Sequence, residues 1–350
     1  MDFSKNKTIN ISGIDIGKDE PCYIIAEIGI NHNGEINIAK KLIDVAVNSG
    51  ANAVKFQKRN LDSLYKTEVL QNPNIESQGF EILLDVLKKV ELSDSNYKEI
   101  VKYCNEKNIT FLCTAWDSIS VDFLETLDVS AYKIASADMT NFPLIKYVAK
   151  TKKPIIVSTG MSTMEEIEKT VDFLKNENID FVLLHSNSTY PAPVESLNLN
   201  LISTLEQKFQ IPVGYSGHEQ GIIPSVTAAI LGAVIIERHI TLDKKMEGID
   251  QSSSLDPLEI TQLISFIRES EKARGKSIKK MTRGEILQRE VLGKSIICSS
   301  DIEKGDIFTK NNLEVKGPAK GISPQFYYEI LGKKSKQTIK KGMYIQQDDL

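Results

Sequence analysis

The stretch CYIIAEI at residues 22–28 opens the repeating pattern that decides the fold of this chain. It is short, apolar and bounded by Pro21 and Gly29, which is typical of a strand buried on both faces. From residue 36 to 48 apolar side chains recur at helical spacing, and Gly50 ends that pattern. A buried strand followed by an amphipathic helix is one β/α unit, the building block of parallel α/β folds.

The same alternation continues to about residue 275. Seven further strands are predicted by short β-branched runs at 52–57, 109–114, 130–135, 154–158, 180–185, 211–215 and 233–238. Helical periodicity predicts helices at 94–107, 118–127, 141–151, 163–176, 197–208, 220–231 and 256–274. Strands and helices in this number and order predict an α/β fold, a (β/α)8 TIM barrel. The stretch 60–80 interrupts the rhythm with polar residues, Pro and Asn, and we expect it to be a long loop over the barrel mouth.

Composition shifts divide the chain into four parts. Residues 1–20 form an N-terminal extension, 21–275 the barrel and the charged stretch 276–290 a linker. Residues 291–350 contain the strand-like runs KSIICS, DIFTK, LEVKG and KKSKQTIK between turns such as EKGD, which predicts a small β-rich domain. A domain of this size buries little core, so we expect it to lean on the barrel or on a second subunit.

Charge and hydropathy exclude several classes of protein. Of the 350 residues, 41% are hydrophobic and 26% charged, which is ordinary for a globular chain, and the net charge of -4 offers no basic surface for nucleic acid. The N-terminus has no apolar segment of signal-peptide length, and no run of about 18 apolar residues occurs, so we expect a cytoplasmic protein with no membrane partner. The four cysteines form no C-x-x-C pair and are interpreted as reduced core residues.

All four histidines lie at or just past a predicted strand end. They are His32, His185, His218 and His239. Catalytic groups in TIM barrels come from these C-terminal strand ends, and the last two strands are neighbours, so His218 and His239 can reach one ion. Two imidazoles with substrate oxygens and water suit manganese, iron, cobalt or zinc, whereas magnesium prefers more oxygen ligands. Alternatively, each histidine packs against a loop, and this is the interpretation we prefer for His32 and His185.

Two lysines form a second group of candidates. Lys55 and Lys133 lie within apolar strands, and an inward-facing charge near the top of a barrel is costly unless it meets an anion. Hydroxyl groups occur at similar heights on four other strand ends, at Thr114, Ser136, Ser158 and Ser216. This arrangement predicts a pocket for phosphate or carboxylate. The alternative is that the lysines extend between helices to solvent.

Acidic residues complete the predicted rim. Glu27 ends the first strand, so its carboxylate either pairs with a lysine or is placed for proton transfer or sugar hydroxyl binding. Asp138 and Asp250 lie on the same rim, where paired-acid chemistry and hydrogen bonding to a sugar are both open. Glycine-rich motifs of the Walker or dinucleotide type do not occur, which argues against a nucleotide cosubstrate.

Seven short motifs, in order along the chain, resemble those of the sialic acid synthase family. They are AEIGINHNG (26–34), VKFQ (54–57), YKIAS (132–136), STGM (158–161), TYPAP (189–193), GYSGHE (214–219) and ERHITLD (237–243). That family comprises N-acetylneuraminate synthase and its legionaminate and pseudaminate relatives, and it ends in an antifreeze-like (SAF) domain, which residues 291–350 resemble. The resemblance implies condensation of phosphoenolpyruvate with an N-acylated mannosamine-type sugar, which gives a nonulosonic 2-keto acid and phosphate.

The resemblance also implies roles for individual residues. Manganese, with magnesium or cobalt as alternatives, would bind His218 and His239. The residues matching phosphoenolpyruvate contacts are Lys55, Thr114, Lys133, Ser136, Ser158, Ser188 and Ser216. The residues matching sugar contacts are Glu27, Gln57, Asp138, Tyr190 and Asp250. Glu27, Lys55 and Lys133 are the catalytic candidates, with Glu27 positioning or deprotonating the attacking water, and the implied assembly is a domain-swapped homodimer.

One position departs from the family pattern. Many bacterial members carry an arginine in a string like K-R-P-G-x-G of the C-terminal domain, which reaches the sugar in the partner's barrel, and here Gly317 stands at that place. Lys316 or Lys320 could substitute, although lysine lacks the planar fork of arginine. The acceptor is therefore open between N-acetylmannosamine, a diacetamido-trideoxyhexose and a phosphorylated N-acetylmannosamine. A non-catalytic sugar-binding barrel is the remaining alternative, and the lysine pair, the histidine pair and Glu27 argue against it.

Overall fold

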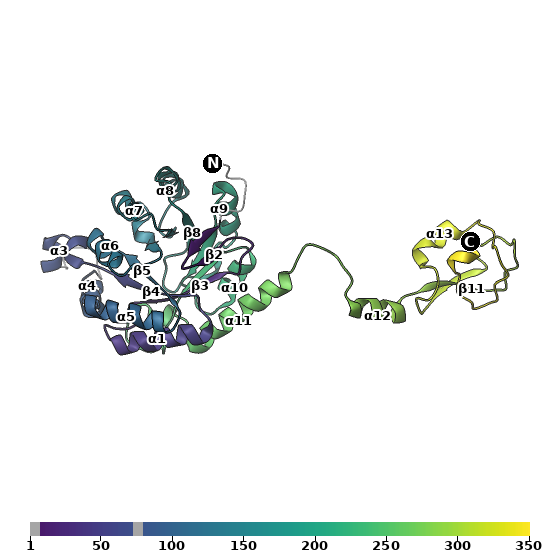
Figure 1. Ribbon diagram of the computed structural model, residues 1–350, viewed down its shortest axis with the longest axis horizontal. Coiled ribbons are helices and arrows are strands. Elements are labelled where there is room, and N and C mark those ends of the chain that lie inside the picture. The colour runs from purple at the N-terminus through teal and green to yellow at the C-terminus, as the bar shows by residue number, and fades with distance from the viewer. Residues whose placement is uncertain (1–7, 73–79) are drawn as a thin grey trace. The chain divides into compact units, whose positions relative to one another are not determined.

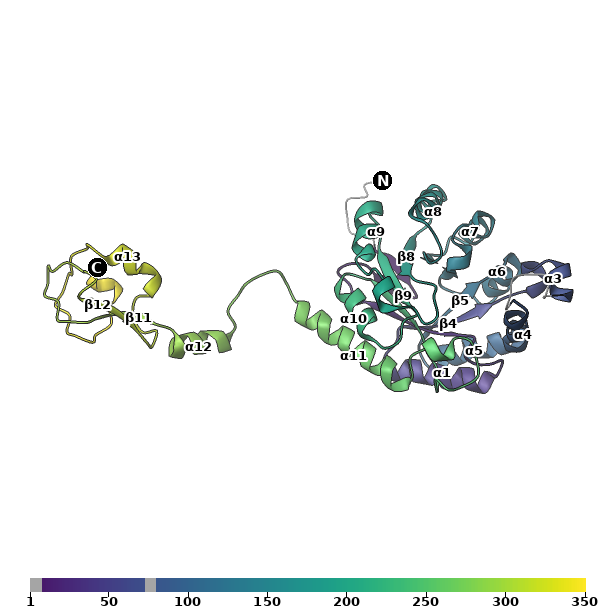
Figure 2. The same cartoon turned by 180° about the vertical axis from the view of Figure 1, so that it is seen from behind.

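The structure of the chain is a computed structural model that describes residues 8–72 and 80–350. It forms two compact units, Met1–Gly275 and Lys276–Leu350, and each is described by itself. Figure 1 shows the N-terminal unit from one side and Figure 2 from behind, with helices surrounding a central set of strands. Within the described residues, no helix combines the length and the apolar character that crossing a membrane requires.

Eight parallel strands of the N-terminal unit close into a barrel in the order β10-β3-β4-β5-β6-β7-β8-β9. They are β3 (Tyr23–Gly29), β4 (Ala53–Lys58), β5 (Thr110–Ala115), β6 (Tyr132–Ile134), β7 (Ile155–Ser158), β8 (Phe181–Ser186), β9 (Val213–Gly217) and β10 (Ile235–His239). Closure joins the first and last of these strands, with Ile235 opposite Tyr23 and His239 opposite Glu27. The predicted TIM barrel is confirmed.

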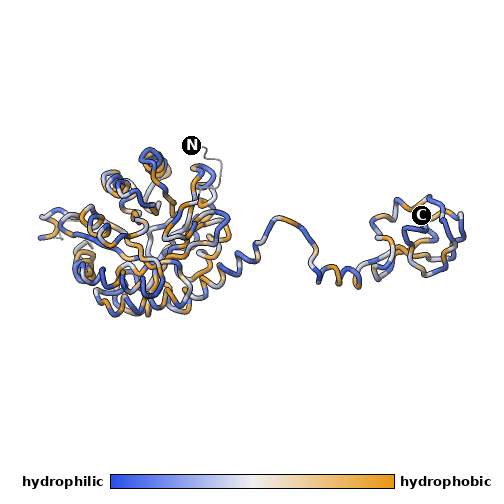
Figure 3. The backbone as a smooth tube through the Cα atoms, viewed as in Figure 1, coloured by the Kyte–Doolittle hydropathy of each residue, from blue (hydrophilic) through white to orange (hydrophobic). Residues whose placement is uncertain are grey.

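Each strand of the barrel is followed by at least one helix. These helices include α1 (Ile36–Ser49), α5 (Asp94–Glu106), α6 (Ser118–Glu125), α7 (Phe142–Ala149), α8 (Met164–Asn176), α9 (Leu201–Phe209), α10 (Ile223–Ile230) and α11 (Pro257–Arg274). Their ends follow from local chemistry: Gly50 stops α1 with φ +84°, and Thr163 and Glu166 form a capping box that starts α8. In Figure 3 blue hydrophilic and orange hydrophobic segments alternate along these helices, as expected for helices with one buried face.

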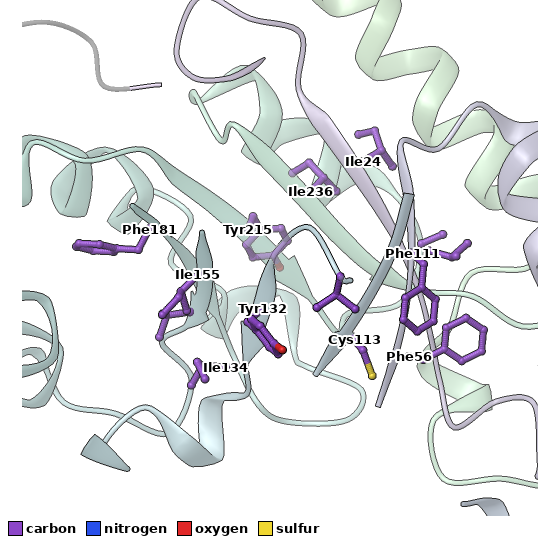
Figure 4. Packing of buried hydrophobic residues seen from close by; sticks show 14 of the residues in the cluster. Ile24, Phe56, Phe111, Cys113, Tyr132, Ile134, Ile155, Phe181, Tyr215 and Ile236 are labelled. Atoms are coloured by element: carbon purple, nitrogen blue, oxygen red, sulfur yellow. The ribbon is translucent and has the colours of Figure 1, made fainter. Parts of the chain in front are cut away.

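Side chains on the barrel strands alternate between two apolar environments. One set points outward and packs beneath the helices, as Figure 4 shows for Ile24, Phe56 and Ile236. The other set, which includes Ile25 and Ile235, fills the interior near the N-terminal ends of the strands. Successive residues of a strand lie on opposite faces, so every second residue of each strand points into the interior of the barrel.

A short hairpin seals the N-terminal end of the barrel. It consists of β1 (Ile9–Ile11) and β2 (Ile14–Ile16), which pair in antiparallel fashion. Ile9, Ile11 and Ile16 are at most 2% exposed and join the interior apolar cluster. The extension thus contributes part of the barrel core, a role that the sequence analysis did not assign to it.

The expectation of a structureless loop over 60–80 was wrong for its described part. The chain forms α2 (Leu61–Leu64) and α3 (Thr67–Gln71), and α4 (Phe80–Val90) begins where the loop was expected to end; 73–79 lie outside the described residues. Asn60 starts α2, because its side-chain oxygen accepts a hydrogen bond from the Ser63 amide at 2.9 Å. Such short helices lie largely at the surface, so their polar composition resembles that of a loop.

The C-terminal unit has its own small core. It contains α12 (Arg283–Leu292), β11 (Ser295–Cys298), β12 (Leu313–Lys316) and α13 (Tyr327–Ile330), and β11 pairs with β12 in antiparallel fashion. The predicted strands in KSIICS and LEVKG are confirmed. DIFTK and KKSKQTIK are joined only by an isolated bridge between Ile307 and Lys334, and Ile339 of the latter makes a second one with Ile302, which precedes DIFTK. Those two strand predictions were wrong because the unit packs mainly loops around Ile296, Phe308 and Leu313.

Short elements and cysteines complete the description. The 3-10 turns are η2 (Ser136–Asp138), η3 (Val194–Ser196), η4 (Gln251–Ser253), η5 (Pro324–Phe326) and η6 (Gln347–Asp349). The helix α12 lies partly inside the predicted linker, where Thr282 and Glu285 form a capping box. All four cysteines are buried and free of disulfides, as the sequence analysis expected.

Candidate functional site

A polar pocket occupies the C-terminal end of the barrel. Its lining comes from the ends of the barrel strands and the turns that follow them: Glu27, Lys55, Gln57, Thr114, Trp116, Lys133, Ala135, Ser136, Ala137, Ser158, Met161, Ser188, Tyr190, Ser216, His218, Glu237 and His239. The pleat explains the set, because Glu27 follows Ile25 by two residues and Glu237 follows Ile235 by two, so each shares the inward face of its strand. On β3 and β10 the interior of the barrel therefore changes from apolar to charged within two residues.

Lys55 lies in the centre of a buried charge network. Its Nζ is 2.8 Å from Glu27 Oε2 and 3.6 Å from Glu237 Oε1, and it donates a hydrogen bond to Thr114 Oγ1 at 3.1 Å. Burial lowers the pKa of Lys55, but the carboxylates of Glu237 and Glu27 outweigh this effect and raise it above its ordinary value. The ammonium group is therefore charged at neutral pH.

Lys133 loses its proton more easily than Lys55, because its pKa is lowered whereas that of Lys55 is raised. Its Nζ donates to Ser158 Oγ at 2.6 Å and to the Ile134 carbonyl at 3.0 Å, and it lies 3.9 Å from Glu237 Oε1. Burial lowers the pKa of Lys133 to about 8, although the Glu237 carboxylate partly opposes this effect. Because this value is close to neutral pH, Lys133 is the ammonium group in the pocket whose charge responds most readily to its surroundings.

Glu237 joins the two lysines. Burial raises the pKa of this carboxyl, but the ammonium groups of Lys133 and Lys55 outweigh burial and hold it below its ordinary value. One carboxylate oxygen accepts a hydrogen bond from Ser216 Oγ at 3.1 Å, and the other is buried with no hydrogen-bond partner within residues 8–72 and 80–350. With Glu27, Glu237, Lys55 and Lys133 all ionised, the network has no net charge.

The two candidate metal ligands lie close together at the C-terminal ends of the neighbouring strands β9 and β10. The ring centroids of His218 and His239 are 5.8 Å apart. His218 Nδ1 lies 2.7 Å from the Asn187 carbonyl, to which it donates, so Nε2 is the acceptor that receives the Tyr190 hydroxyl at 2.9 Å. Burial, with the nearby His239, lowers the pKa of His218 to about 3, so the ring is neutral at physiological pH.

These histidines fit a divalent transition metal. A neutral imidazole with its tautomer fixed by a carbonyl is the form that binds metals, and the His239 Nδ1 atom is buried and has no hydrogen-bond partner among the residues that the structure describes. In the part of the chain that the structure describes, no cluster of three or more His, Cys, Asp or Glu side chains is arranged as a metal centre. A metal at His218 and His239 would therefore take its remaining ligands from substrate or water, which suits a catalytic role better than a structural one.

The structure brings nearly all of the predicted site residues together. Those that line the pocket are Glu27, Lys55, Gln57, Thr114, Lys133, Ser136, Ser158, Ser188, Tyr190, Ser216, His218 and His239. Asp138 and Asp250 are not among the lining residues. Asp138 is buried in η2, where it accepts a hydrogen bond from Asn141 Nδ2 at 2.9 Å, and Asp250 directly precedes η4. Contact of these two carboxylates with the sugar stays a prediction.

His32 and His185 pack within the fold. The ring of His32 stacks on Phe56 with centroids 5.9 Å apart, and its Nδ1 accepts the Gly34 amide at 3.1 Å. His185 Nε2 lies 2.6 Å from the Leu197 carbonyl. Neither lines the pocket, so both fit the packing interpretation.

The lining residues that sequence reasoning missed are Trp116, Ala135, Ala137, Met161 and Glu237. The signal for Glu237 was present, because it precedes His239 by two residues on one strand and so shares its face. Trp116 follows β5 by one residue, and the Arg59 guanidinium lies 4.8 Å from its ring centroid. No periodicity marks a residue in a turn, so Trp116 and Met161 could be placed only by the structure.

A closed parallel barrel with ammonium, carboxylate and imidazole groups gathered at its C-terminal mouth has the architecture of a TIM-barrel enzyme. The NeuB family model matches residues 42–279 and the SAF domain model matches residues 293–350. The chain belongs to the NeuB family, the sialic acid synthases, as the motifs suggested, and it carries a C-terminal SAF domain.

Three relatives illustrate the similarity. The chain is 41% identical to the N,N'-diacetyllegionaminic acid synthase of Campylobacter jejuni, over 93% of this chain and 98% of that protein. It is 37% identical to the human N-acetylneuraminate-9-phosphate synthase, over 95% and 94%. It also superimposes with a TM-score of 0.73 on the crystal structure of the N-acetylneuraminic acid synthetase from Leptospira borgpetersenii in complex with citrate, at 32% identity over 81% and 95%.

Proposed function

We propose that this chain condenses phosphoenolpyruvate with an N-acyl amino sugar to give a nonulosonic acid and phosphate. The observation that carries the proposal is the pair of buried ammonium groups, Lys55 and Lys133, within the pocket at the barrel mouth. Support also comes from relatives named as legionaminic, neuraminic and pseudaminic acid synthases, each matched over most of this chain.

The lysines and hydroxyls bind and orient phosphoenolpyruvate. Lys55 donates to Thr114 and Lys133 to Ser158, so each ammonium group already has a hydroxyl beside it that can take part in the same anion contact. Ser136, Ser188 and Ser216 add donors around the pocket. Charge-assisted hydrogen bonds from fixed donors hold a phosphate or carboxylate in one orientation, which lowers the entropic part of the barrier.

Charge balance supports a divalent cation at the same site. The four ionised side chains of the network cancel, so a multiply charged anion entering this pocket brings negative charge that the protein does not neutralise. We therefore propose that His218 and His239 hold a divalent metal, with manganese the first choice and magnesium or cobalt as alternatives. When bound, the metal supplies Lewis-acid polarisation of the sugar aldehyde.

Glu27 is our candidate for the water step. C3 of phosphoenolpyruvate forms the new bond to the sugar aldehyde carbon, water adds at C2, and phosphate leaves by cleavage of its C–O bond. Glu27 Oε1 accepts a hydrogen bond from Gln57 Nε2 at 2.8 Å while Oε2 pairs with Lys55, so the carboxylate is held toward the pocket in one orientation. It can position the attacking water and accept its proton. Glu237 offers a second buried carboxylate, with one oxygen lacking a hydrogen bond.

The sugar and the assembly are parts of the same proposal. N-acetylmannosamine or a close N-acyl sugar is the primary candidate, and a diacetamido-trideoxyhexose is favoured as the second by the match to the legionaminic acid synthase. A phosphorylated N-acetylmannosamine is the third. We propose a domain-swapped homodimer in which the SAF domain of one subunit completes the site of the other.

Phosphate release tests the reaction. The full chain is incubated with phosphoenolpyruvate and each sugar in turn, with manganese or with EDTA, and free phosphate and the 2-keto acid product are measured. The proposal expects release that requires one sugar and the metal, with one phosphate per product. Metal-dependent sugar binding without phosphate release would instead indicate a non-catalytic barrel.

A further inference from the structure

A second ion pair lies directly behind the two histidines, outside the pocket. Arg238 comes between Glu237 and His239 on β10, so its side chain points out of the barrel while theirs point in. Its partner Glu219 directly follows His218. Arg238 Nη1 lies 2.9 Å from Glu219 Oε1, and the two side chains are 1% and 0% exposed. Each member of the pair is thus the chain neighbour of one candidate metal ligand.

Hydrogen bonds tie this pair to the turn between β9 and α10. Arg238 Nη2 donates to the Glu219 carbonyl at 2.6 Å, and Nη1 donates to the Gly221 carbonyl at 2.9 Å. Ser225 Oγ donates to Glu219 Oε1 at 2.9 Å, and the Tyr215 hydroxyl donates to Glu219 Oε2 at 2.8 Å. The strand that carries His239 thus holds the backbone of the turn that carries His218.

Packing around Gly217 shows how tightly the turn is fixed. Gly217 pairs with Arg238 across the two strands. A Cβ atom on this glycine would lie 2.6 Å from Glu219 Oε2, 2.7 Å from Tyr215 Cε1 and 2.9 Å from Arg238 Cδ. A side chain at position 217 would collide with these atoms. Glycine therefore allows Arg238 and Glu219 to form their ion pair next to His218.

Stability alone is a poor explanation for this arrangement. A fully buried ion pair often contributes less to stability than apolar side chains of similar volume, because both charges lose their hydration. Such a pair does fix the relative orientation of the two segments that carry it, since the planar guanidinium binds partners only at defined angles. Here the two segments carry His218 and His239, so the ion pair fixes the positions of the two imidazoles relative to each other.

We propose that Arg238 and Glu219 are positioning residues for the metal site: their ion pair fixes the turn after β9 against β10, so that His218 and His239 keep the separation and orientation needed to hold one divalent ion. This inference rests on the proposed function, because it takes the two imidazoles as metal ligands. Residues that orient metal ligands from behind typically change metal affinity by about 10- to 100-fold when altered.

Manganese titration of the full chain tests the inference, with free manganese followed by its electron paramagnetic resonance signal. Glu219→Gln removes the charge at nearly constant shape and is expected to raise the Kd for manganese about tenfold or more. Tyr215→Phe removes only the hydroxyl that orients Glu219 and is expected to raise it a few-fold. Tyr132→Phe is the matched control, since Tyr132 also points out of the barrel and donates to a carboxylate, Glu125, at 2.8 Å; its Kd should stay within about twofold of wild type.

Two further measurements separate positioning from general damage. Phosphoenolpyruvate affinity of the metal-free variants is measured by calorimetry and should stay within about twofold of wild type, because the lysines are untouched. Thermal unfolding is recorded for each variant, and if Glu219→Gln does not fold, Tyr215→Phe carries the test because it buries no unpaired charge. Unchanged manganese affinity in the folded variants, or an equal loss in Tyr132→Phe, overturns the inference. Failure of the wild-type chain to bind manganese overturns the proposed metal site and this inference together.

Discussion

The two ends of the barrel interior are built from the same strands and differ in almost every physical property. At the N-terminal end, β3, β4 and β10 contribute Ile25, Ala53 and Ile235 to an apolar cluster. Two residues further along, the same strands contribute Glu27, Lys55 and Glu237 to a network of buried charges. The same strands pass through both ends, so the change from core to site follows the change in their side chains.

This contrast separates stability from function within one structure. Apolar burial at the N-terminal end favours folding by about 25 cal/mol for each Å² removed from water. At the C-terminal end, four ionisable groups are taken out of water and are held by one another and by hydrogen bonds to neighbouring polar groups, which is costly and is typical of functional sites. Substitutions at the two ends should therefore have opposite signatures, and the following predictions use that difference.

The largest effect is expected from the imidazole pair. His218→Ala or His239→Ala should remove bound metal and abolish turnover while the fold stays intact, because each removes half of the protein ligands. Metal content is measured by elemental analysis and folding by circular dichroism. His185→Gln is the control, since His185 is a buried strand-end histidine that does not line the pocket. Unchanged metal content in both single alanine variants would contradict the assignment.

The lysines should show the next largest effect. Lys55→Ala or Lys133→Ala is expected to weaken phosphoenolpyruvate binding by about 2–5 kcal/mol, much of it from leaving the anion unpaired in a poorly solvated site. Calorimetry gives the affinities directly. Lys153→Ala serves as the control, because Lys153 pairs with Glu125 at 2.9 Å and does not line the pocket. Equal affinity in wild type and both pocket variants would rule out the anion site.

At the opposite end of the barrel, a substitution should alter stability and leave chemistry alone. Ile11→Ala removes a side chain that is 0% exposed and should lower the free energy of unfolding by about 2–5 kcal/mol, with kcat unchanged below the unfolding transition. Ile14→Ala in the same hairpin is the control, because Ile14 is 38% exposed and should change stability by less than about 0.5 kcal/mol. Denaturant titration followed by fluorescence measures both. An Ile11→Ala chain as stable as wild type would show that the hairpin is dispensable to the core.

The pH dependence of anion binding sharpens the comparison between the two lysines. The pKa of Lys133 is lowered to about 8 by burial, so its ammonium group loses its proton as pH rises above that value. The Kd for phosphoenolpyruvate should then rise, approaching tenfold per pH unit. Measurement from pH 7 to 9.5 checks this, and Lys133→Arg, which keeps its charge, should flatten the profile. A flat wild-type profile over that range would mean that Lys133 does not titrate there.

The smallest effect is expected from the C-terminal domain's lysines. Lys316 is 59% exposed and already pairs with Glu314 at 2.9 Å, so Lys316→Ala, like Lys320→Ala, should lower turnover by less than about tenfold, or about 1.4 kcal/mol.

Removal of the whole domain, residues 291–350, should by contrast lower turnover sharply, because we expect this domain to act as a lid that excludes water. Steady-state kinetics compares the three. A single lysine variant as inactive as the truncated chain would show that a lysine has replaced the family's arginine, and full activity of the truncated chain would refute the lid.

Most of the barrel could be predicted from the sequence, because buried parallel strands are short, apolar and separated by helices of clear periodicity. The same regularity placed Lys55 and Lys133 on inward faces, and it placed His239 at a strand end. Glu237 obeys this rule too, because it lies two residues before His239 on the same strand. The alternating run INISGIDI at 9–16 contains a hairpin signal, yet strands of three residues are stable only against the barrel interior. Turn residues such as Trp116 follow no period, so only the fold can place them.

The hairpin at the closed end of the barrel also constrains how the chain reaches its native state. Ile9 and Ile11 precede Val234 and Ile235 of the same cluster by more than two hundred positions in the sequence. Contacts between residues so far apart in sequence form slowly, because the entropy of closing a large loop is lost before the contacts contribute any stabilisation. During synthesis the apolar residues of the hairpin therefore lack these partners until β10 has left the ribosome. This makes the hairpin a natural target for chaperones and a place where a bulky N-terminal fusion would hinder barrel closure.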